Sequence, residues 1–384
     1  MKILFNINMK LLFVLGSRGE WGYIRPLIQL AKNSSHDVEI WCANMSVLNR
    51  FGKLSEVIKQ EGYPVVGEFY TAVDGDDNLA LAKSFGLVSL SASDWLMNHD
   101  YDWIIVSGDR VEQLAFVVVA SLSNKAICHI QAGERSGNID GKNRHAIARY
   151  AHLHMAANTE AADRLIRSGE DADRVKVTGA PQIDDMVNQQ IPTLLELKER
   201  TVVSSDKFIL SVFHGVTEDL QASKEGIDKL INALTKIKLP VIWIGSNNDT
   251  LGSFIEKKII SSLRINDKFY SNLNRLDYLS LLANCEFIIG NSSSGILEAP
   301  TFGKPAVNLG RRQADRFRDV NVIDCEYDEA DISVSISKAL SEPFKKLCLQ
   351  STNPYGNGDS SRKILDVLEN TEINSDFLIK QITY

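Results

Sequence analysis

The chain has 384 residues, of which 44% are hydrophobic and 24% charged, and its formal net charge is −7 at pH 7. This composition is typical of a folded globular protein and excludes collagen-like, disordered and coiled-coil chains. At this length we expect two domains of roughly 150–200 residues each. The acidic balance argues against nucleic acid as the main partner, because proteins that neutralise phosphates normally carry a basic face.

The cysteine pattern and the absence of long apolar runs bear on the compartment. Five cysteines are widely spaced, and none belongs to a C-x-x-C pair, which favours reduced thiols in a cytoplasmic protein. No apolar run reaches the ~20 residues of a membrane span, so no membrane partner is expected. The opening MKILFNIN nearly repeats the following MKLLFVLG, which leaves both Met1 and Met9 as candidate start residues.

Short apolar segments alternate with helical patterns along the first half of the chain. The expected strands are residues 10–15, 38–43, 103–107, 126–130, 153–157 and 175–178. The expected helices are residues 22–32, 47–60, 111–123 and 159–168. Continuously apolar strands separated by helices predict a parallel sheet that is covered on both faces.

The alternation stops at residues 186–206, which include Pro192, and then resumes. Strands are expected at 208–213, 241–244, 287–289, 306–309 and 320–323, and helices at 221–237, 276–283, 295–302 and 328–340. The predicted fold is α/β, with two Rossmann-like domains and a central cleft. We place the first domain at residues 1–186, the second at 187–364, and a helical tail at 365–384 that packs back on the first domain. Ligands of such sheets bind beyond the carboxyl ends of the strands, so the cleft is the expected site.

Three polar segments follow expected strands of the first domain. The turn at 16–19, with the sequence GSRG, leads into a helix whose N-terminal N–H groups attract phosphate or carboxylate, although a plain strand–helix turn has the same pattern. Asp109 and Arg110 follow the strand 103–107, where they either face the cleft or cap a helix. Residues 129–145 hold two histidines, two carboxylates and two arginines, which favours an acid/base cluster beside an anionic leaving group over a polar loop. His152 and His154 form an H-x-H pair without a suitably spaced third metal ligand, which favours structural roles.

The second domain has its own polar residues at strand ends. His214 follows the strand 208–213. The segment 290–295, with the sequence GNSSSG, starts a helix, and its hydroxyl and N–H groups predict a diphosphate nest, with a helix N-cap as the alternative. Glu298 lies one turn further on, where it can accept sugar hydroxyls. Arg312 follows the strand 306–309 and suits bidentate binding of phosphate.

Taken together, these segments resemble the UDP-N-acetylglucosamine 2-epimerase family, and most closely its hydrolysing branch, which serves sialic-acid-type and legionaminic-acid-type sugar synthesis. The matching stretches are GSRGEWGYIRPL, SGDRVEQL, HIQAGERSGNIDGKNRHAIARYAHLH, VTGAPQID, FHGVTED and GNSSSGILEAPTFGKPAVNLGRRQ. They span residues 16–313 in the family's order. The resemblance implies a glycosyltransferase-B-like fold with UDP in the cleft and a homodimer or homotetramer.

The resemblance also implies roles for individual residues. The matched catalytic residues are Asp109, Asp140, Arg144 and His214. The matched UDP-binding residues are Arg18, Arg110, Ser292, Ser293, Gly295, Glu298 and Arg312. One position departs from the pattern: several family members carry a glutamate acid/base where this chain has Gln131. Either Glu134 supplies the missing carboxylate or Gln131 orients the substrate.

The implied reaction converts UDP-N-acetylglucosamine and water to N-acetylmannosamine and UDP, by elimination followed by hydration, and needs no metal or redox cofactor. The stretch SGNIDGKNRHAI favours the hydrolysing over the non-hydrolysing branch. Two alternatives stay open. One is a hydrolysing epimerase that acts on UDP-N,N'-diacetylbacillosamine, and the other is a UDP-sugar-binding protein without catalysis, which Gln131 slightly favours.

Overall fold

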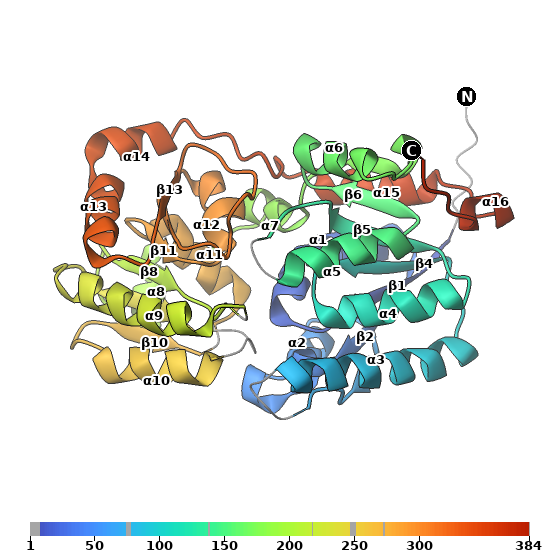
Figure 1. Ribbon diagram of the computed structural model, residues 1–384, viewed down its shortest axis with the longest axis horizontal. Helices are drawn as coiled ribbons and strands as arrows, with labels where there is room; N and C mark the ends of the chain where they lie inside the picture. Colours follow the sequence, from blue (N-terminus) through green and yellow to red (C-terminus); the bar gives the residue numbers. More distant parts are fainter. Residues whose placement is uncertain are drawn as a thin grey trace.

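The computed structural model describes residues 8–73, 78–136, 139–216, 218–245, 251–271 and 273–383, with Arg18, Asn78, Ile139 and Asp140 described by their backbone alone. The chain forms two α/β units that lie side by side (Figure 1). We call the unit built on the first sheet the first domain and the other the second domain. None of the described helices combines the length and apolar composition needed to cross a bilayer.

The first sheet has seven parallel strands in the order β3-β2-β1-β4-β5-β6-β7. The strands are β1 (Lys10–Leu15), β2 (Asp37–Ala43), β3 (Val65–Phe69), β4 (Trp103–Ser107), β5 (Ile127–Ala132), β6 (Leu153–Ala156) and β7 (Val175–Val177). Successive side chains of a strand face opposite sides of its sheet. Thus Leu11 and Phe13 of β1 enter one buried cluster, and Leu12 and Val14 enter another.

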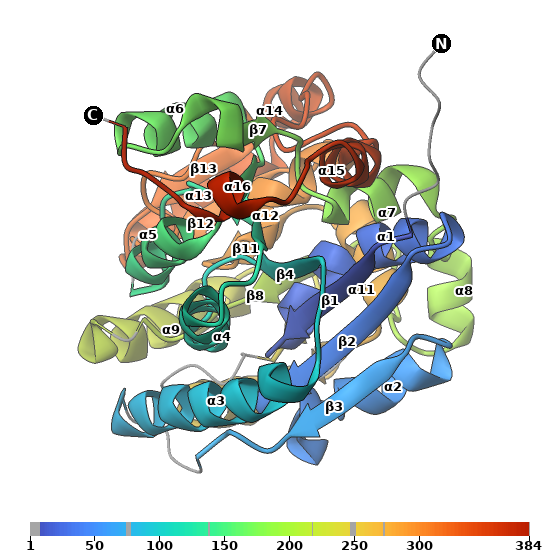
Figure 2. The same cartoon turned by 90° about the vertical axis from the view of Figure 1, so that its right-hand side faces the viewer.

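Helices cover both faces of the first sheet (Figure 2). The face reached by Phe13 packs against α1 (Arg18–Asn33), α2 (Leu54–Gln60) and α15 (Ser360–Glu369). The face reached by Val14 packs against α3 (Asn78–Asn98), α4 (Val111–Leu122) and α5 (Ile139–Tyr150). The first domain also contains α6 (Thr159–Arg167) and the short 3₁₀ helices η1 (Asn44–Val47), η2 (Asn49–Phe51) and η3 (Ala172–Arg174).

The second sheet has six parallel strands in the order β10-β9-β8-β11-β12-β13. They are β8 (Ile209–Val212), β9 (Val241–Ile244), β10 (Lys268–Tyr270), β11 (Ile288–Gly290), β12 (Ala306–Leu309) and β13 (Val322–Cys325). One face is covered by α9 (Leu220–Thr235), α10 (Gly252–Ser262), α13 (Glu329–Leu340) and α14 (Glu342–Cys348). The other is covered by α8 (Leu194–Glu199), α11 (Arg275–Asn284) and the 3₁₀ helix η4 (Ala299–Phe302), and α12 (Ser294–Leu297) follows β11.

The chain passes between the domains twice, and the two crossings touch. Helix α7 (Gln182–Asn188) lies on the outward path, and α15 follows the return path (Figure 1). The N–H of Ala180 donates to the carbonyl of Tyr355 at 2.6 Å. The Asp184 carboxylate accepts the N–H groups of Ser360 and Ser361 at 3.0 and 2.7 Å and thereby caps α15. Helix α15 and the short α16 (Ser375–Leu378) thus return the C-terminal segment to the first domain, where they join its core.

The two parallel sheets confirm the predicted fold class. The expected helix 47–60 is wrong, because the backbone is left-handed at Gly52 and Lys53 and α2 begins only at Leu54. The expected helix 295–302 ends at Leu297 and continues as η4, which contains Pro300. The edge strands β3 and β10 and the helices α3, α5, α7, α8, α10 and α14 were not predicted.

Candidate active site

A cavity of about 410 Å³ lies between the two domains, at the carboxyl ends of the central strands. Both domains supply charged and polar side chains to its wall. Those from the first domain include Glu20, Tyr23, Asp109, Arg110 and Arg144. Those from the second include His214, Arg275, Ser292, Ser293, Glu298, Arg312 and Arg316. Most of the candidate residues named from the sequence therefore share one cavity.

Asp109 and Arg144 form an ion pair in this wall. Asp109 follows β4 after Gly108, whose φ of 71° allows the sharp turn. Arg144 reaches it from α5: its Nη2 donates to the Asp109 carboxylate, and its Nη1 donates to the carbonyl of Gln131 at 2.8 Å. Burial raises the pKa of Asp109, but the charges of nearby arginines outweigh that effect and hold the pKa below its ordinary value. The Asp109 carboxylate is therefore ionised at neutral pH.

Gln131 and Glu134 are not among the residues that line the cavity. Gln131 lies in β5 with a left-handed φ of 57°, and its side chain donates to the side chain of Gln182 on α7. Glu134 is 2% exposed and pairs with Arg316 at 2.8 Å and with Arg144 at 3.6 Å. The structure thus shows both Glu134, the proposed substitute carboxylate, and Gln131, the proposed orienting amide, held by partners within the protein.

Just before α1, a side chain of the protein itself binds two backbone N–H groups of the turn 16–19. The Glu20 carboxylate accepts the N–H groups of Gly16 and Ser17 at 2.6 and 2.8 Å. Burial and, to a smaller extent, the neighbouring Glu112 raise the pKa of Glu20 to about 8. These two N–H groups are therefore already bound. The side chain of Arg18, like that of Asp140 on α5, lies outside the described part of the structure.

Arg110 lies beside Asp109 at the start of α4. Its Nε is 3.6 Å from Glu112, which is fully buried and also accepts a hydrogen bond from the side chain of Asn44. Arg110 is one of the arginines that lower the pKa of Asp109. The Arg110 guanidinium thus lies in the cavity wall next to the buried carboxyl group of Glu112.

In the second domain, Asn291 ties together the loops that follow β8 and β11. Its side chain accepts the N–H of His214 at 2.7 Å and donates to the carbonyl of the same residue at 2.8 Å. Its carbonyl accepts a hydrogen bond from Arg312 at 3.2 Å. His214, Arg312 and the serine loop are therefore held in a fixed relation along one side of the cavity.

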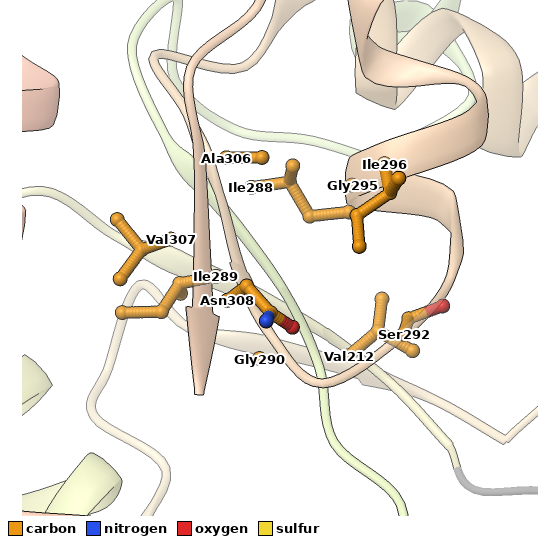
Figure 3. A pocket seen from close by; sticks show the side chains of 10 residues that line it. All are labelled: Val212, Ile288, Ile289, Gly290, Ser292, Gly295, Ile296, Ala306, Val307 and Asn308. Atoms are coloured by element: carbon orange, nitrogen blue, oxygen red, sulfur yellow. The ribbon is translucent and has the colours of Figure 1, made fainter. Parts of the chain in front are cut away.

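The serine loop depends on a glycine at its start. Gly290 has a φ of 138°, and a Cβ there would lie 1.9 Å from the carbonyl oxygen of Val212. Ser292 and Ser293 follow and line the cavity, and the N–H of Ser294 donates to the Ser292 hydroxyl at 3.3 Å. Gly295 is not in the cavity wall. It lines a separate pocket of about 10 Å³ behind the loop, where Figure 3 shows Ile288 and Asn308.

Glu298 is fixed by two neighbours in the wall of the cavity. Arg275, the first residue of α11, donates to one carboxylate oxygen at 2.6 Å, and the Ser294 hydroxyl donates to the other. The Ser294 hydroxyl in turn accepts a hydrogen bond from Tyr278. Arg275 and Tyr278 were not singled out from the sequence, because nothing in the motif of Glu298 indicates that α11 lies beside it.

The two histidines of the H-x-H pair bind groups of the first domain and its tail. His154 contacts Glu170 at 2.9 Å, and Lys380 contacts the same carboxylate at 2.6 Å. The Nδ1 of His152 accepts the N–H of Ile127 at 3.1 Å, and burial lowers the pKa of His152 to about 4. Within the described ranges, no three His, Cys, Asp or Glu side chains gather in an arrangement that could hold a metal ion.

Comparison with known proteins places the chain in a family. Residues 31–369 match the family model described as UDP-N-acetylglucosamine 2-epimerase. The chain is 30% identical to the UDP-N,N'-diacetylbacillosamine 2-epimerase (hydrolyzing) of Legionella pneumophila, over 98% of this chain and 99% of that protein. It is 28% identical to the UDP-N-acetylglucosamine 2-epimerase of Neisseria meningitidis serogroup B, over 94% of this chain and 96% of that protein.

The fold agrees with that assignment. The crystal structure of UDP-GlcNAc 2-epimerase from Neisseria meningitidis bound to UDP-GlcNAc superposes with a TM-score of 0.79 at 19% identity, covering 94% of this chain and 100% of that one. The family match extends over both domains and begins within α1, after the first strand. The chain belongs to the UDP-N-acetylglucosamine 2-epimerase family.

Proposed function

We propose that this protein is a hydrolysing UDP-N-acetylglucosamine 2-epimerase that releases N-acetylmannosamine and UDP for sialic-acid-type sugar synthesis. The observation that carries the proposal is the composition of the cavity wall. The Asp109–Arg144 pair and the set Ser292, Ser293 and Arg312 face the same cavity from different domains. The first set suits proton transfer and the second suits a diphosphate, and the reaction of a nucleotide sugar needs both.

The proposed reaction has two steps. First, the C2 hydrogen leaves as a proton while the C1–O bond to the diphosphate breaks, which gives UDP and an unsaturated 2-acetamido sugar. Water then adds its hydroxyl to C1, and a proton adds to C2 on the face opposite to the one from which the first proton left. The product is N-acetylmannosamine. The ionised Asp109 can accept a proton, and Asp140 is the second proposed proton carrier.

Stabilisation of the leaving group carries much of the barrier, because no carbonyl group activates the C2 hydrogen. Arg312 and the hydroxyl and N–H groups of the serine loop are fixed before the diphosphate charge develops. Donors fixed in this way stabilise a developing anion without the cost of reorganising solvent. By analogy with oxyanion holes, loss of one such donor raises the barrier by roughly 3–4 kcal/mol.

The second candidate substrate is UDP-N,N'-diacetylbacillosamine. The 30% identity to the Legionella pneumophila enzyme of that name favours it. The two substrates differ at C4 and C6 of the sugar, whereas the reacting atoms C1 and C2 and the diphosphate are shared. Both proposals therefore use the same residues.

The test is to incubate purified protein with each nucleotide sugar in turn and to separate the products by chromatography. Free UDP with N-acetylmannosamine, from UDP-N-acetylglucosamine, supports the first proposal. Turnover of the bacillosamine nucleotide alone supports the second. Release of UDP-N-acetylmannosamine without free UDP supports the non-hydrolysing branch. UDP binding without turnover of either substrate contradicts catalysis and supports a binding protein.

A further inference from the structure

Four charged side chains form a continuous chain of contacts from the candidate proton carrier to the other domain. Arg144 donates to Asp109 on one side and lies 3.6 Å from Glu134 on the other. Glu134 in turn lies 2.8 Å from Arg316, which comes from the loop after β12 in the second domain. The charges alternate in sign along this chain, and they sum to zero.

Because these four charged side chains are largely buried, the loss of one partner is costly for the other. Glu134 and Arg144 are each 2% exposed, and Arg316 is 6% exposed. A buried charge that loses its partner is costly, because no water replaces the lost interaction. Glu134 therefore needs a cationic partner, and two arginines, Arg144 and Arg316, lie close enough to serve. Arg316 is the nearer of the two by 0.8 Å, the difference between 3.6 and 2.8 Å.

We propose that Arg316 is a positioning residue for the Asp109 carboxylate: it neutralises Glu134 and thereby leaves Arg144 to bind Asp109. Without Arg316, Glu134 has Arg144 as its only arginine partner in this cluster, and the guanidinium is drawn away from Asp109. A residue of the second domain thus controls a proton-carrying group of the first. The relevance to catalysis rests on the proposed function, but the effect on Asp109 does not.

The charged and titratable groups around Asp109 come from every side of the cavity. They are Arg110 on its own loop, His129 on β5, Arg144 on α5, Tyr23 on α1 and Arg316 on the second domain. Burial raises the pKa of Asp109, and Arg144, Arg316 and Arg110 lower it, in this order of strength. Removing Arg316 therefore raises this pKa directly. The proposal adds that it also weakens the larger effect of Arg144.

A double-mutant cycle separates the direct effect from the proposed one. The variants are Arg316→Gln, Glu134→Gln and the combination of the two. The readout is the pH titration of the Asp109 carboxyl carbon by ¹³C NMR, assigned through Asp109→Asn. In Arg316→Gln we expect the pKa of Asp109 to rise by about one unit or more. Arg311→Gln is the matched control, because it removes the same charge from an exposed position of the same loop.

The decisive comparison is the effect of Glu134→Gln in two backgrounds. If Glu134 competes for Arg144, this substitution changes the pKa of Asp109 little in the wild type and by about one unit in Arg316→Gln. Equal shifts in both backgrounds would show that the charges act independently, and would overturn the proposal. An unchanged Asp109 pKa in Arg316→Gln would overturn it as well.

Kinetics give a second readout and separate this inference from the proposed function. With the substrate that the wild type turns over, kcat of Arg316→Gln falls roughly 100-fold, as expected for a misplaced catalytic group. The combination with Glu134→Gln recovers most of it, whereas a merely structural role of Arg316 predicts no recovery. If Arg316→Gln does not fold, the double variant Glu134→Gln with Arg316→Leu removes both charges together. Arg316→Lys keeps the positive charge, so it must keep the wild-type pKa of Asp109. A wild type without turnover refutes the function, while the titrations still test Arg316.

Discussion

Arg275 and Glu298 form an ion pair of 2.6 Å in the wall of the interdomain cavity. Glu298 is 5% exposed, and its second oxygen accepts the Ser294 hydroxyl, so the orientation of the carboxylate is fixed before any ligand arrives. A carboxylate held in this way presents its remaining lone pairs in one direction. This is what recognition of a pair of sugar hydroxyls requires.

Loss of the Arg275 charge is expected to weaken UDP binding. In Arg275→Met the Glu298 carboxylate loses the cation that fixes its orientation, and truncation of one partner of a buried charge pair lowers the binding free energy by about 2–5 kcal/mol. Isothermal titration calorimetry with UDP measures the effect. The matched variant, Arg275→Met with Glu298→Gln, removes the unpaired charge and is expected to recover part of the affinity. Unchanged UDP affinity in Arg275→Met would contradict the role of this pair.

Asp109→Asn tests the proposed proton carrier. The amide cannot accept the proton, so we expect turnover to fall by roughly 10²–10⁴-fold while UDP binding is largely kept. Initial rates of UDP release and a parallel UDP titration measure the two quantities. Asp100→Asn is the control, because its side chain is 86% exposed at the opposite end of β4, where it pairs with Lys125. Normal turnover in Asp109→Asn would refute the assignment.

Gln131→Glu tests the position where this chain departs from the family pattern. The Nε2 atom of Gln182 has no hydrogen-bond partner among the described residues. If the side-chain amide of Gln182 flips by about 180°, its NH₂ group can donate to the new carboxylate. We therefore expect the variant to fold and to keep most of its activity. Adding Gln182→Leu removes that donor and is expected to destabilise the protein. Loss of activity in a folded Gln131→Glu variant would instead favour an orienting amide.

Glu20 is expected to make the stability of the protein depend on pH. Its carboxyl has a pKa of about 8 in the folded protein, against an ordinary value of 4.5 for an exposed glutamate. Its contribution to stability is complete below pH ~4.5 and is lost as the pH rises through 8, by up to about 1.4 kcal/mol per pH unit. Urea unfolding at pH 6 and pH 8.5 measures this loss. Glu20→Gln keeps an acceptor for the two N–H groups and must flatten the dependence, and an equally steep fall in that variant would refute it.

Gly290→Ala is expected to disturb the serine loop. The added Cβ would lie 1.9 Å from the Val212 carbonyl oxygen, and φ is 138°. Such strain costs at least about 1–3 kcal/mol. Gly86→Ala is the control, since a Cβ on that residue of α3 would meet nothing within 4 Å, and we expect it to stabilise the protein by roughly 0.5–1 kcal/mol. Thermal unfolding compares the two variants, and equal melting temperatures would show that the serine loop tolerates a Cβ at this position.

The sequence predicted the predominantly apolar strands better than the two strands of mixed composition, β3 and β10. The bounds of β1, β4, β9 and β12 agree with the expected ranges, because these strands are predominantly apolar and almost all of their residues are buried. The edge strands β3 and β10 are only half-buried, and their mixed composition hid them. Helix α3 has two charged residues in 21, so it lacks the polar stripe by which a surface helix is recognised.

The candidate site was predicted in part, for a similar reason. Asp109, His214 and Ser292 each follow a strand, and the topology of parallel sheets brings strand ends together. Arg275 and Arg316 could not be predicted from the sequence, because their roles depend on which loops face each other across the cavity. Their partners, Glu298 and Glu134, lie 23 and 182 residues away along the chain, and neither sequence separation indicates contact.

The proposed reaction is tested most directly by proton NMR of the purified protein with UDP-N-acetylglucosamine in D₂O. The elimination removes the C2 hydrogen and the hydration replaces it from solvent. We therefore expect free UDP together with N-acetylmannosamine that carries deuterium at C2. N-acetylmannosamine that retains hydrogen at C2 would contradict the elimination. If the protein binds UDP but leaves both UDP-N-acetylglucosamine and the bacillosamine nucleotide unchanged, the catalytic function itself is contradicted.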